Sequence, residues 1–319
     1  MRRLACVSLF LSAVAGGMAA ETETPAATRA SFTYPRAVIT GTVEGITEFL
    51  PVSSTGHMII SDRLMKVPKN ADVIVSDITD RKGRPITQER VADDYIVIIQ
   101  VGAIAAVLVV FFARIRGVIS GLLRGDRPAL QLAMSLLLAF LPSAILGLFF
   151  KEAIGAYLFS VEVVAGALMI GGVVILGAEQ ILPKVKFREQ EVAEIQTSQA
   201  LVVGLCQCFA LIPGTSRSLS TILGGRLAGL SHAAATEFSF LVGLLTLSAA
   251  SIYKMWALGP ALTQIYPAGP ASVGLLVAAV TAFVSVKWLV GYVSRNGLGV
   301  FAWYRIALGG VILATLALK

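Results

Sequence analysis

The stretch "EGITEFLPVSSTGH" (residues 44–57) places two glutamates, a cluster of hydroxyl residues and a histidine inside a chain that is otherwise strongly apolar. Pro51 has no backbone N–H, so a helix does not continue through it without a break. A second stretch, "QCFALIPGTSRS" (residues 207–218), repeats the order of an acid or amide, an apolar turn, a proline and hydroxyl residues. We interpret the two stretches as the turns of two broken helices that form a weak internal repeat.

Composition indicates a membrane protein. Of the 319 residues, 56% are hydrophobic and 14% are charged, and the mean hydropathy of +0.81 lies far above that of a soluble domain. Nearly uncharged windows that are long enough to cross about 30 Å of hydrocarbon lie at residues 95–113, 129–150, 161–182, 238–258, 272–293 and 300–318. The sequence therefore predicts an all-α integral membrane protein with six transmembrane helices.

The two broken segments, residues 36–61 and 199–231, are not predicted to span the membrane. Each is followed by three spans, and an odd number of crossings turns the second copy upside down relative to the first. Inverted repeats with broken helices place a binding site near the middle of the bilayer. We therefore expect two re-entrant helical hairpins, one from each side, in a first repeat over 36–182 and a second over 199–319. The polar segment 62–94 is predicted to be an external loop.

Charge in the connections predicts the topology. Lys and Arg gather in residues 114–127 and 183–198 but are absent from 259–271, so the first two connections are predicted to be cytoplasmic. The net charge of +7 comes without a basic stripe interleaved with aromatic residues, which argues against a nucleic-acid partner. The N-terminus is then expected outside the cytoplasm.

The first residues agree with that orientation. A basic start, an apolar run and small residues over 1–20 are typical of a signal peptide, with cleavage after Ala19 or Ala20. An uncleaved N-terminal anchor is the alternative. Residues 21–35 are interpreted as a polar linker.

Two carboxylates characterise the first hairpin. Glu44 and Glu48 are four residues apart and share one helical face, and a lone carboxylate in lipid costs several kcal/mol. They could share a proton, or bind a divalent cation such as Mg²⁺ or Ca²⁺ that bridges to phosphate oxygens. Capping and hydrogen bonding of the opposite hairpin is the alternative.

After Pro51 a second half-helix begins, and its free N–H groups favour an anion. Ser53 or Ser54 is the predicted N-cap. His57 follows Ser54 by three residues, so its imidazole is expected to reach that hydroxyl and exchange a proton with it. The second hairpin supplies hydroxyl residues at another half-helix N-terminus: Thr215, Ser216 and Ser218.

Arg217 is the decisive residue of the second hairpin. An arginine in an apolar stretch is unfavourable unless it meets an anion, and its planar guanidinium suits a phosphate. Extension of its side chain to the cytoplasmic surface is the alternative. Glu237 is expected either to support Arg217 or to be an ordinary hydrogen-bonded acid, and His232 to be an interface residue. The cysteines are interpreted as packing residues: Cys6, Cys206 and Cys208.

The motifs "EGITEFLPVSSTGHMII" and "PGTSRSLSTILGGRLAGLSHAAATEFSFL" closely resemble those of the bacterial undecaprenyl-diphosphate phosphatases, also known as bacitracin-resistance proteins. The resemblance covers the chain from about residue 36 to the C-terminus. It implies hydrolysis of undecaprenyl diphosphate to undecaprenyl phosphate, which recycles the carrier lipid for cell-wall synthesis. It also implies a bacterial inner-membrane protein, a site that faces the periplasm, and dependence on a divalent cation.

The resemblance further implies five catalytic residues: Glu44, Glu48, Ser54, His57 and Arg217. It also implies a phosphate-binding set at the two helix starts: Ser53, Thr55, Gly56, Thr215, Ser216 and Ser218. Glu44 and Glu48 are the tentative metal ligands. Whether Ser54 or His57 is the nucleophile stays open, as does the oligomeric state, for which a homodimer is one alternative. The chain departs from the family pattern in about thirty extra N-terminal residues and in a longer 62–94 loop, which leaves open whether this loop covers the site.

A transporter or flippase for polyprenyl phosphate is the main alternative function, because the same inverted repeat can hold an anion for transport. Transport needs cationic groups, but it does not need a hydroxyl residue together with an imidazole and two carboxylates. A purely structural membrane scaffold does not explain ionisable residues in re-entrant segments.

Overall fold

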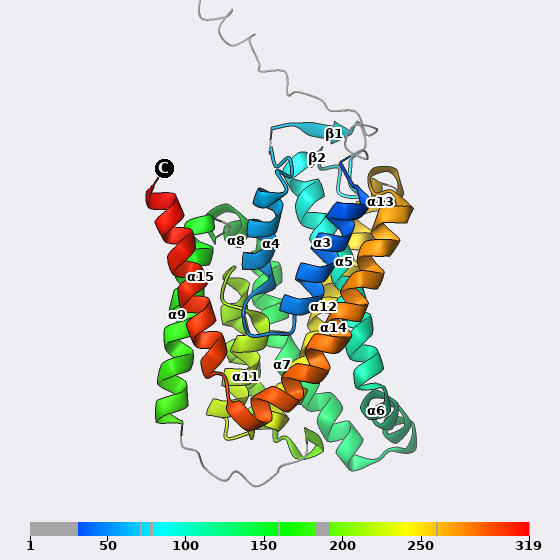
Figure 1. Cartoon of the computed structure of the whole chain (residues 1–319). Coiled ribbons are helices and arrows are strands. Elements are labelled where there is room, and N and C mark those ends of the chain that lie inside the picture. The colour runs from blue at the N-terminus through cyan, green and yellow to red at the C-terminus, as the bar shows by residue number, and fades with distance from the viewer. Residues whose placement is uncertain are drawn as a thin grey trace, which may run out of the picture.

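The computed structural model describes residues 31–70, 72–76, 79–158, 160–182, 192–259 and 261–318. In these ranges six helices are long and apolar enough to cross a membrane, as predicted. They are α5 (Gln88–Val110), α7 (Arg127–Phe149), α9 (Val161–Ile181), α12 (His232–Leu258), α14 (Ala268–Asn296) and α15 (Gly299–Ala317). They form a bundle whose long axis is vertical in Figure 1. The signal-peptide and linker predictions, Cys6 and the basic residues of 183–191 lie outside the described residues.

Two pairs of shorter helices occupy the segments predicted as hairpins. The first pair is α3 (Tyr34–Thr47) and α4 (Ser54–Leu64), and the second is α10 (Thr197–Gln207) and α11 (Arg217–Leu227), with the 3-10 turn η2 (Cys208–Leu211) between them. In Figure 1 the two pairs enter the bundle from opposite ends, and the α3–α4 turn lies about halfway along it. Helical hairpins are therefore present, while their re-entrant position in a bilayer stays a prediction.

The first span starts and ends earlier than predicted. Thr87 caps α5 by accepting a hydrogen bond from the backbone N–H of Arg90, so the helix begins inside the segment predicted as a loop. The loop boundary at residue 94 was therefore wrong, because Asp94 is neutralised by Lys254 and can sit in a helix. At the other end, the predicted connection 114–127 is largely helical and forms α6 (Phe112–Arg124).

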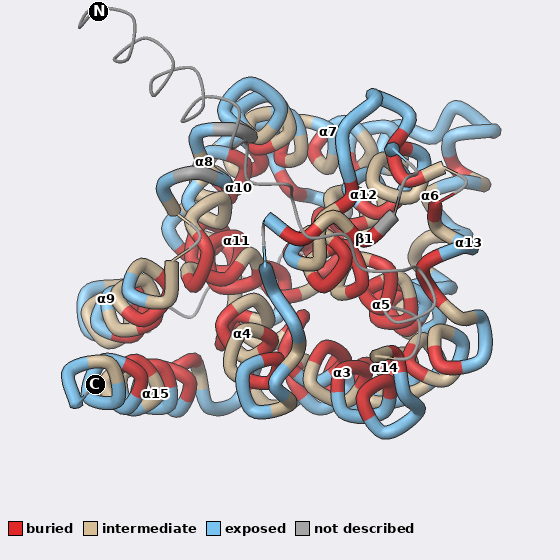
Figure 2. The backbone as a smooth tube through the Cα atoms, turned by 90° about the horizontal axis from the view of Figure 1, so that it is seen from above, coloured by how far each residue is buried: buried red, intermediate tan, exposed pale blue. Residues whose placement is uncertain are grey.

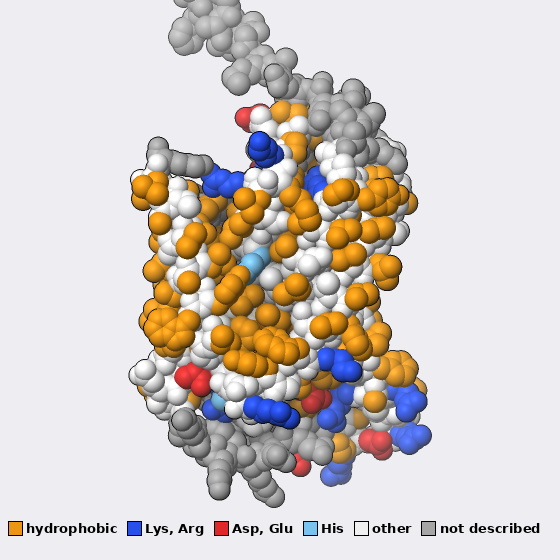
Figure 3. Space-filling model, in the orientation of Figure 1, with side chains coloured by type: hydrophobic (Ala, Val, Ile, Leu, Met, Phe, Trp, Pro, Cys, Tyr) orange, Lys and Arg blue, Asp and Glu red, His pale blue; other side chains and the backbone are white. Residues whose placement is uncertain are grey.

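Helices of the first predicted repeat pack against helices of the second. Helix α3 packs along α14, which also lies against α5, and α15 packs along α9. Buried residues face the interior of the bundle in Figure 2, whereas exposed residues lie at its periphery. Figure 3 shows hydrophobic side chains over the middle of the surface and most Lys and Arg near its two ends, the pattern of a protein surrounded by lipid. The chain is a multi-pass membrane protein.

A polar cap covers one end of the bundle. It contains a two-stranded antiparallel sheet of β1 (Ile74–Ser76) and β2 (Ile86–Thr87), next to the short helix α13 (Ala261–Ile265). The remaining short elements are α8 (Lys151–Leu158) and the 3-10 turn η1 (Val192–Glu194). The segment predicted as an external loop thus contains a small sheet.

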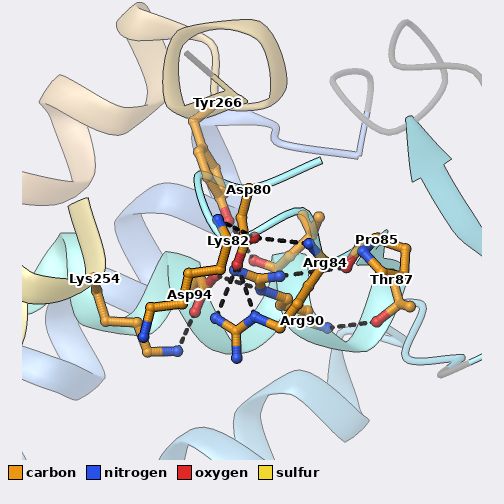
Figure 4. A network of polar contacts seen from close by, with 10 residues as sticks. Asp80, Lys82, Arg84, Pro85, Thr87, Arg90, Asp94, Lys254 and Tyr266 are labelled. Carbon is orange, nitrogen blue, oxygen red and sulfur yellow. Dashed lines mark hydrogen bonds and ion pairs between the residues drawn. The ribbon is translucent and has the colours of Figure 1, made fainter. Parts of the chain in front are cut away.

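Asp80 organises this cap, as Figure 4 shows. Its carboxylate accepts hydrogen bonds from the backbone N–H groups of Lys82 and Arg84 and from the Arg84 and Arg90 side chains. Arg90 also lies 3.5 Å from Asp94, which pairs with Lys254. The network therefore connects the cap to α5 and α12.

We expect Asp80→Asn to loosen the cap, with faster proteolysis within residues 66–87 of the purified protein. Burial raises the pKa of Asp80, but the backbone and side-chain hydrogen bonds from Arg84, Arg90 and Lys82 outweigh burial and hold the pKa below its usual range. A lowered folded-state pKa means that the stabilisation is complete above about pH 4 and is lost as the pH falls further. The difference between wild type and variant should therefore be constant from about pH 5 to 8. A variant as resistant as the wild type would contradict this role.

Candidate active site

The two turns share an unusual backbone conformation. Ser53, the N-cap of α4, has φ of 70°, and Ser216, the N-cap of α11, has φ of 78°. Each hydroxyl accepts a hydrogen bond from a backbone N–H in the first turn of its helix. Left-handed φ is strained for residues other than glycine and is concentrated at functional sites. Both helix starts are thus held in a strained shape at corresponding positions of the two hairpins.

A cavity of about 360 Å³ lies between these turns. Seven residues of the predicted site line it: Glu44, Glu48, Ser53, Ser54, Thr55, Ser216 and Arg217. The two hairpins therefore bring an acidic group and a guanidinium together.

Arg217 is held from three directions. Its Nη1 donates to the carbonyl of Ser239 at 3.1 Å, and its Nη2 donates to Glu48 Oε1 at 3.2 Å. The guanidinium carbon lies 5.1 Å from the centre of the Phe49 ring. Its Nε is buried and has no hydrogen-bond partner among the described residues. The side chain does not extend to the surface, so the alternative reading of Arg217 is wrong.

Glu48 connects the two hairpins. One carboxylate oxygen accepts from Arg217, and the other accepts from the Ser54 hydroxyl at 2.5 Å. Only 7% of the Glu48 side chain is exposed. A carboxylate this close to a hydroxyl can accept its proton, which is the first requirement for making Ser54 a nucleophile.

Glu44 is the residue that could hold a cation. Both of its carboxylate oxygens are buried without a hydrogen-bond partner among the described residues, although the side chain lines the cavity. An unpaired buried carboxylate needs a proton or a cation. No group of three or more His, Cys, Asp and Glu suited to a metal occurs in the described part of the chain. A cation at Glu44 and Glu48 would therefore take its other ligands from phosphate oxygens and water, as Mg²⁺ often does.

His57 is not hydrogen-bonded to Ser54, so the predicted hydrogen bond between these two residues is wrong. Its Nδ1 lies 2.7 Å from the carbonyl oxygen of Ser53, and its Nε2 lies 2.6 Å from the Tyr304 hydroxyl. The two rings are stacked with their centres 5.6 Å apart. The spacing of three residues does put His57 near the turn, but α15 supplies a better partner than Ser54 does.

Three predicted phosphate-binding residues lie outside the cavity lining. The backbone N–H of Gly56 is used by Ser53, and Gly56 packs closely on α9. The Thr215 N–H is bonded to the Ile212 carbonyl. The hydroxyl of Ser218 is fully buried and donates to the Leu50 carbonyl at 2.8 Å, which joins α11 to the first turn. These contacts support the turns, whereas phosphate binding by these residues stays a prediction.

Arg305 is a residue that sequence reasoning missed. It is fully buried on α15 and donates hydrogen bonds to the carbonyls of Pro51 at 3.1 Å and Gly214 at 2.9 Å, one in each hairpin turn. It also donates to the carbonyls of Ala167 and Leu168 on α9. Among the described residues it makes no ion pair with a carboxylate. Arg305, which belongs to α15, therefore connects both hairpin turns to α9 through hydrogen bonds of its guanidinium.

Two lysines near the cap also line the cavity. Lys69 comes from the polar loop and pairs with Asp62 at 3.1 Å and Asp93 at 2.9 Å, while Lys254 of α12 pairs with Asp94. The polar loop thus contributes to the wall of the site. Sequence offered no signal for these pairings, because each joins residues from different helices or loops.

Glu237, His232 and the two described cysteines lie outside the cavity lining. Glu237 pairs with Arg114 at 2.9 Å, so it does not support Arg217. His232 lies at the interface between α12 and α9, with Nε2 3.3 Å from Glu179. Cys206 and Cys208 are free thiols, as predicted.

The fold and the cavity define a multi-pass α-helical membrane protein with a polar site between two hairpin turns. Residues 37–311 match the sequence model of the bacitracin resistance protein BacA. The chain belongs to this family.

Named relatives cover almost the same length. Over 280 residues the chain is 46% identical to undecaprenyl-diphosphatase 2 of Rhodospirillum rubrum, which covers 88% of this chain and 94% of that protein. It is 42% identical to undecaprenyl-diphosphatase of Polaromonas naphthalenivorans, with the same shares covered. For undecaprenyl-diphosphatase of Sorangium cellulosum the identity is 40%, over 87% of this chain and 84% of the relative.

Proposed function

We propose that this protein hydrolyses undecaprenyl diphosphate to undecaprenyl phosphate and inorganic phosphate. The observation that carries the proposal is the Ser54–Glu48–Arg217 arrangement, in which a hydroxyl, a proton acceptor and a guanidinium meet in one cavity. The names of the relatives agree with it. The product would return the carrier lipid to cell-wall synthesis, and the family to which the chain belongs is named for bacitracin resistance.

The arrangement supports attack by Ser54. Its oxygen would bond to the terminal phosphorus while its proton moves to Glu48, and the bond to the bridging oxygen would break to release the prenyl monophosphate. Glu48 would pass this proton to the departing monophosphate. Water would then cleave the phosphoserine and give its proton to Glu48, which would return it to the Ser54 oxygen as phosphate is released. Arg217 would balance negative charge on the transferred group. His57 as the nucleophile is the alternative, and its bond to Tyr304 would then orient the ring.

A second, apolar cavity can accept the part of the lipid tail next to the diphosphate. It has a volume of about 530 Å³, lies between α7, α12 and the η2 region, and shares Arg217 and Lys254 with the polar cavity. Its apolar lining includes Phe140, Leu148, Leu211 and Ala250. A polar cavity that continues into an apolar one suits a ligand with an anionic head and a hydrocarbon tail.

A divalent cation, Mg²⁺ or Ca²⁺, is part of the proposal. When bound, it would polarise the phosphoryl oxygens. Glu44 and Glu48 are the residues that would hold it.

The proposed location is the bacterial inner membrane, with the site open to the periplasm. The basic connection that contains α6 lies at the end of the bundle opposite to the cap in Figure 1, so the positive-inside rule puts the cap outside. Lys69, Asp93 and Lys254 line the cavity near the cap, which supports an opening on that side. The oligomeric state is not part of the proposal.

The test is phosphate release from undecaprenyl diphosphate by the purified protein in detergent. We expect multiple turnovers for the wild type and a loss of at least about 100-fold for Glu48→Ala and for Ser54→Ala. Trapping and mapping a phosphorylated residue identifies the nucleophile, and activity retained by Ser54→Ala would rule out attack by Ser54.

A transporter of polyprenyl phosphate is the second candidate, because the two hairpins enter from opposite ends of the bundle. The same protein in sealed vesicles would then exchange labelled lipid phosphate between leaflets without hydrolysis. Exchange without phosphate release would overturn the phosphatase proposal.

A further inference from the structure

Helix α6 is separate from the candidate active site and has two distinct faces. Its apolar side chains Phe112, Ile119 and Leu123 recur at helical spacing and are exposed by 61%, 55% and 85%. Arg124 lies on another side of the helix, and Arg116 is at the border between the apolar and the polar side. Within the described residues the helix packs mainly on α5 and α7, and its Arg114 pairs with Glu237 of α12, at the end of the bundle opposite to the cap. An amphipathic helix of this kind lies in the interface between lipid and water.

A groove of about 490 Å³ lies between α6 and the start of α7. Arg114 and Arg127 line it, together with the carboxylate residue Asp126. Arg114 is held by its pair with Glu237, while no partner is recorded for Arg127 among the described residues. In Figure 3, Lys and Arg side chains gather in the region that Figure 1 labels α6.

We propose that this groove binds the headgroup of an anionic phospholipid with hydroxyl groups, of the phosphatidylglycerol class. Arg114 and Arg127 would bind the phosphodiester, and Asp126 would accept a hydrogen bond from a headgroup hydroxyl. The exposed apolar side of α6 would contact the acyl chains. Basic pockets between membrane helices near the cytoplasmic leaflet are typical sites for anionic headgroups. The proposal does not depend on the phosphatase activity.

Gly117 allows a test that leaves every arginine in place. It lines the groove, and a Cβ at this position would meet no atom within 4 Å. Gly117→Leu should therefore fill the groove without disturbing the protein around it. Arg127→Gln is the second variant, because it removes one guanidinium without breaking the Arg114–Glu237 pair. Arg295→Gln is the matched control, since Arg295 is an exposed arginine in the last turn of α14 and does not line the groove.

The experiment measures lipid binding to the detergent-purified protein by native mass spectrometry. Phosphatidylglycerol, phosphatidylethanolamine and phosphatidylcholine are added at equal concentrations. We expect selective retention of phosphatidylglycerol by the wild type and Arg295→Gln, about fivefold weaker binding to Arg127→Gln, and loss of the selective binding in Gly117→Leu.

Three results would overturn the proposal. The first is equal binding of the three lipids, which would indicate non-selective contact. The second is phosphatidylglycerol binding that both groove variants retain. The third is displacement of the lipid by millimolar inorganic phosphate, which would indicate a free-anion site.

Discussion

Replacing Arg217 by alanine is expected to lower kcat/KM for phosphate release by about 100- to 1000-fold, the effect of removing a group that stabilises charge in the transition state. Arg217→Lys keeps the charge but cannot contact Glu48 and Ser239 with one planar guanidinium. It should recover only part of the loss. The measurement is steady-state phosphate release with undecaprenyl diphosphate in detergent.

Loss of folding must be separated from loss of catalysis. Arg217→Ala leaves the Glu48 carboxylate buried without its partner, and breaking a buried pair costs about 3–5 kcal/mol of stability. Adding Glu48→Gln removes the unpaired charge, so the double variant should unfold at a higher temperature than Arg217→Ala. Its activity should not recover, because both groups act in the reaction.

Arg295→Ala is the matched control, since this arginine is exposed at the end of α14. It should have wild-type activity. If Arg217→Ala kept more than about a tenth of the wild-type activity, a transition-state role for the guanidinium would be contradicted.

The long apolar segments could be read from the sequence because lipid imposes a simple requirement. Each span must satisfy its own backbone hydrogen bonds and expose apolar side chains, so composition and length suffice to find it. The breaks at Pro51 and Pro213 were equally readable, because each proline is followed by a cluster of hydroxyl residues in an otherwise apolar segment. Pro142, which has no such cluster after it, lies inside the continuous helix α7. Helix α5 was placed too late, since the pairing of Asp94 with Lys254 depends on the folded structure.

Part of the candidate active site could also be predicted from the sequence, because ionisable residues are unfavourable in an apolar environment. Glu48 and Arg217 stood out as ionisable residues in apolar segments, and the structure joins them. The partner of His57 could not be inferred from spacing, because the Tyr304 hydroxyl comes from α15. Arg305 was missed because its hydrogen-bond partners are backbone carbonyls of distant segments, and the sequence around Arg305 does not indicate them.

Arg305 gives the second large expected effect. It bonds the carbonyls of Pro51 and Gly214, so its guanidinium sets how the two hairpin turns sit relative to each other. We expect Arg305→Lys to lower kcat by about 10- to 100-fold, because a shift of about 1 Å between reacting groups can have an effect of this size. KM should change much less, since the tail and Arg217 still bind the lipid. Arg305→Met, which leaves buried carbonyls unsatisfied, should also reduce the yield of folded protein.

Gly171 provides an independent test of the same positioning. A Cβ at Gly171 would lie 2.2 Å from Arg305 Nη2, so Gly171→Ala must displace the guanidinium while the arginine itself is retained. Gly177→Ala on the same helix is the matched control, because a Cβ there meets no atom within 4 Å. Gly171→Ala should lower kcat in the same direction as Arg305→Lys, and Gly177→Ala should not.

A purely structural role for Arg305 predicts a different outcome. In that case Arg305→Lys and Gly171→Ala would lower the unfolding temperature and the amount of active protein, while kcat per folded molecule stayed at the wild-type value. Titration of active molecules with a phosphate analogue such as vanadate separates the two cases. A positioning residue lowers the turnover of each active molecule, because Ser54 and Arg217 come from opposite hairpins and must meet the same phosphorus atom.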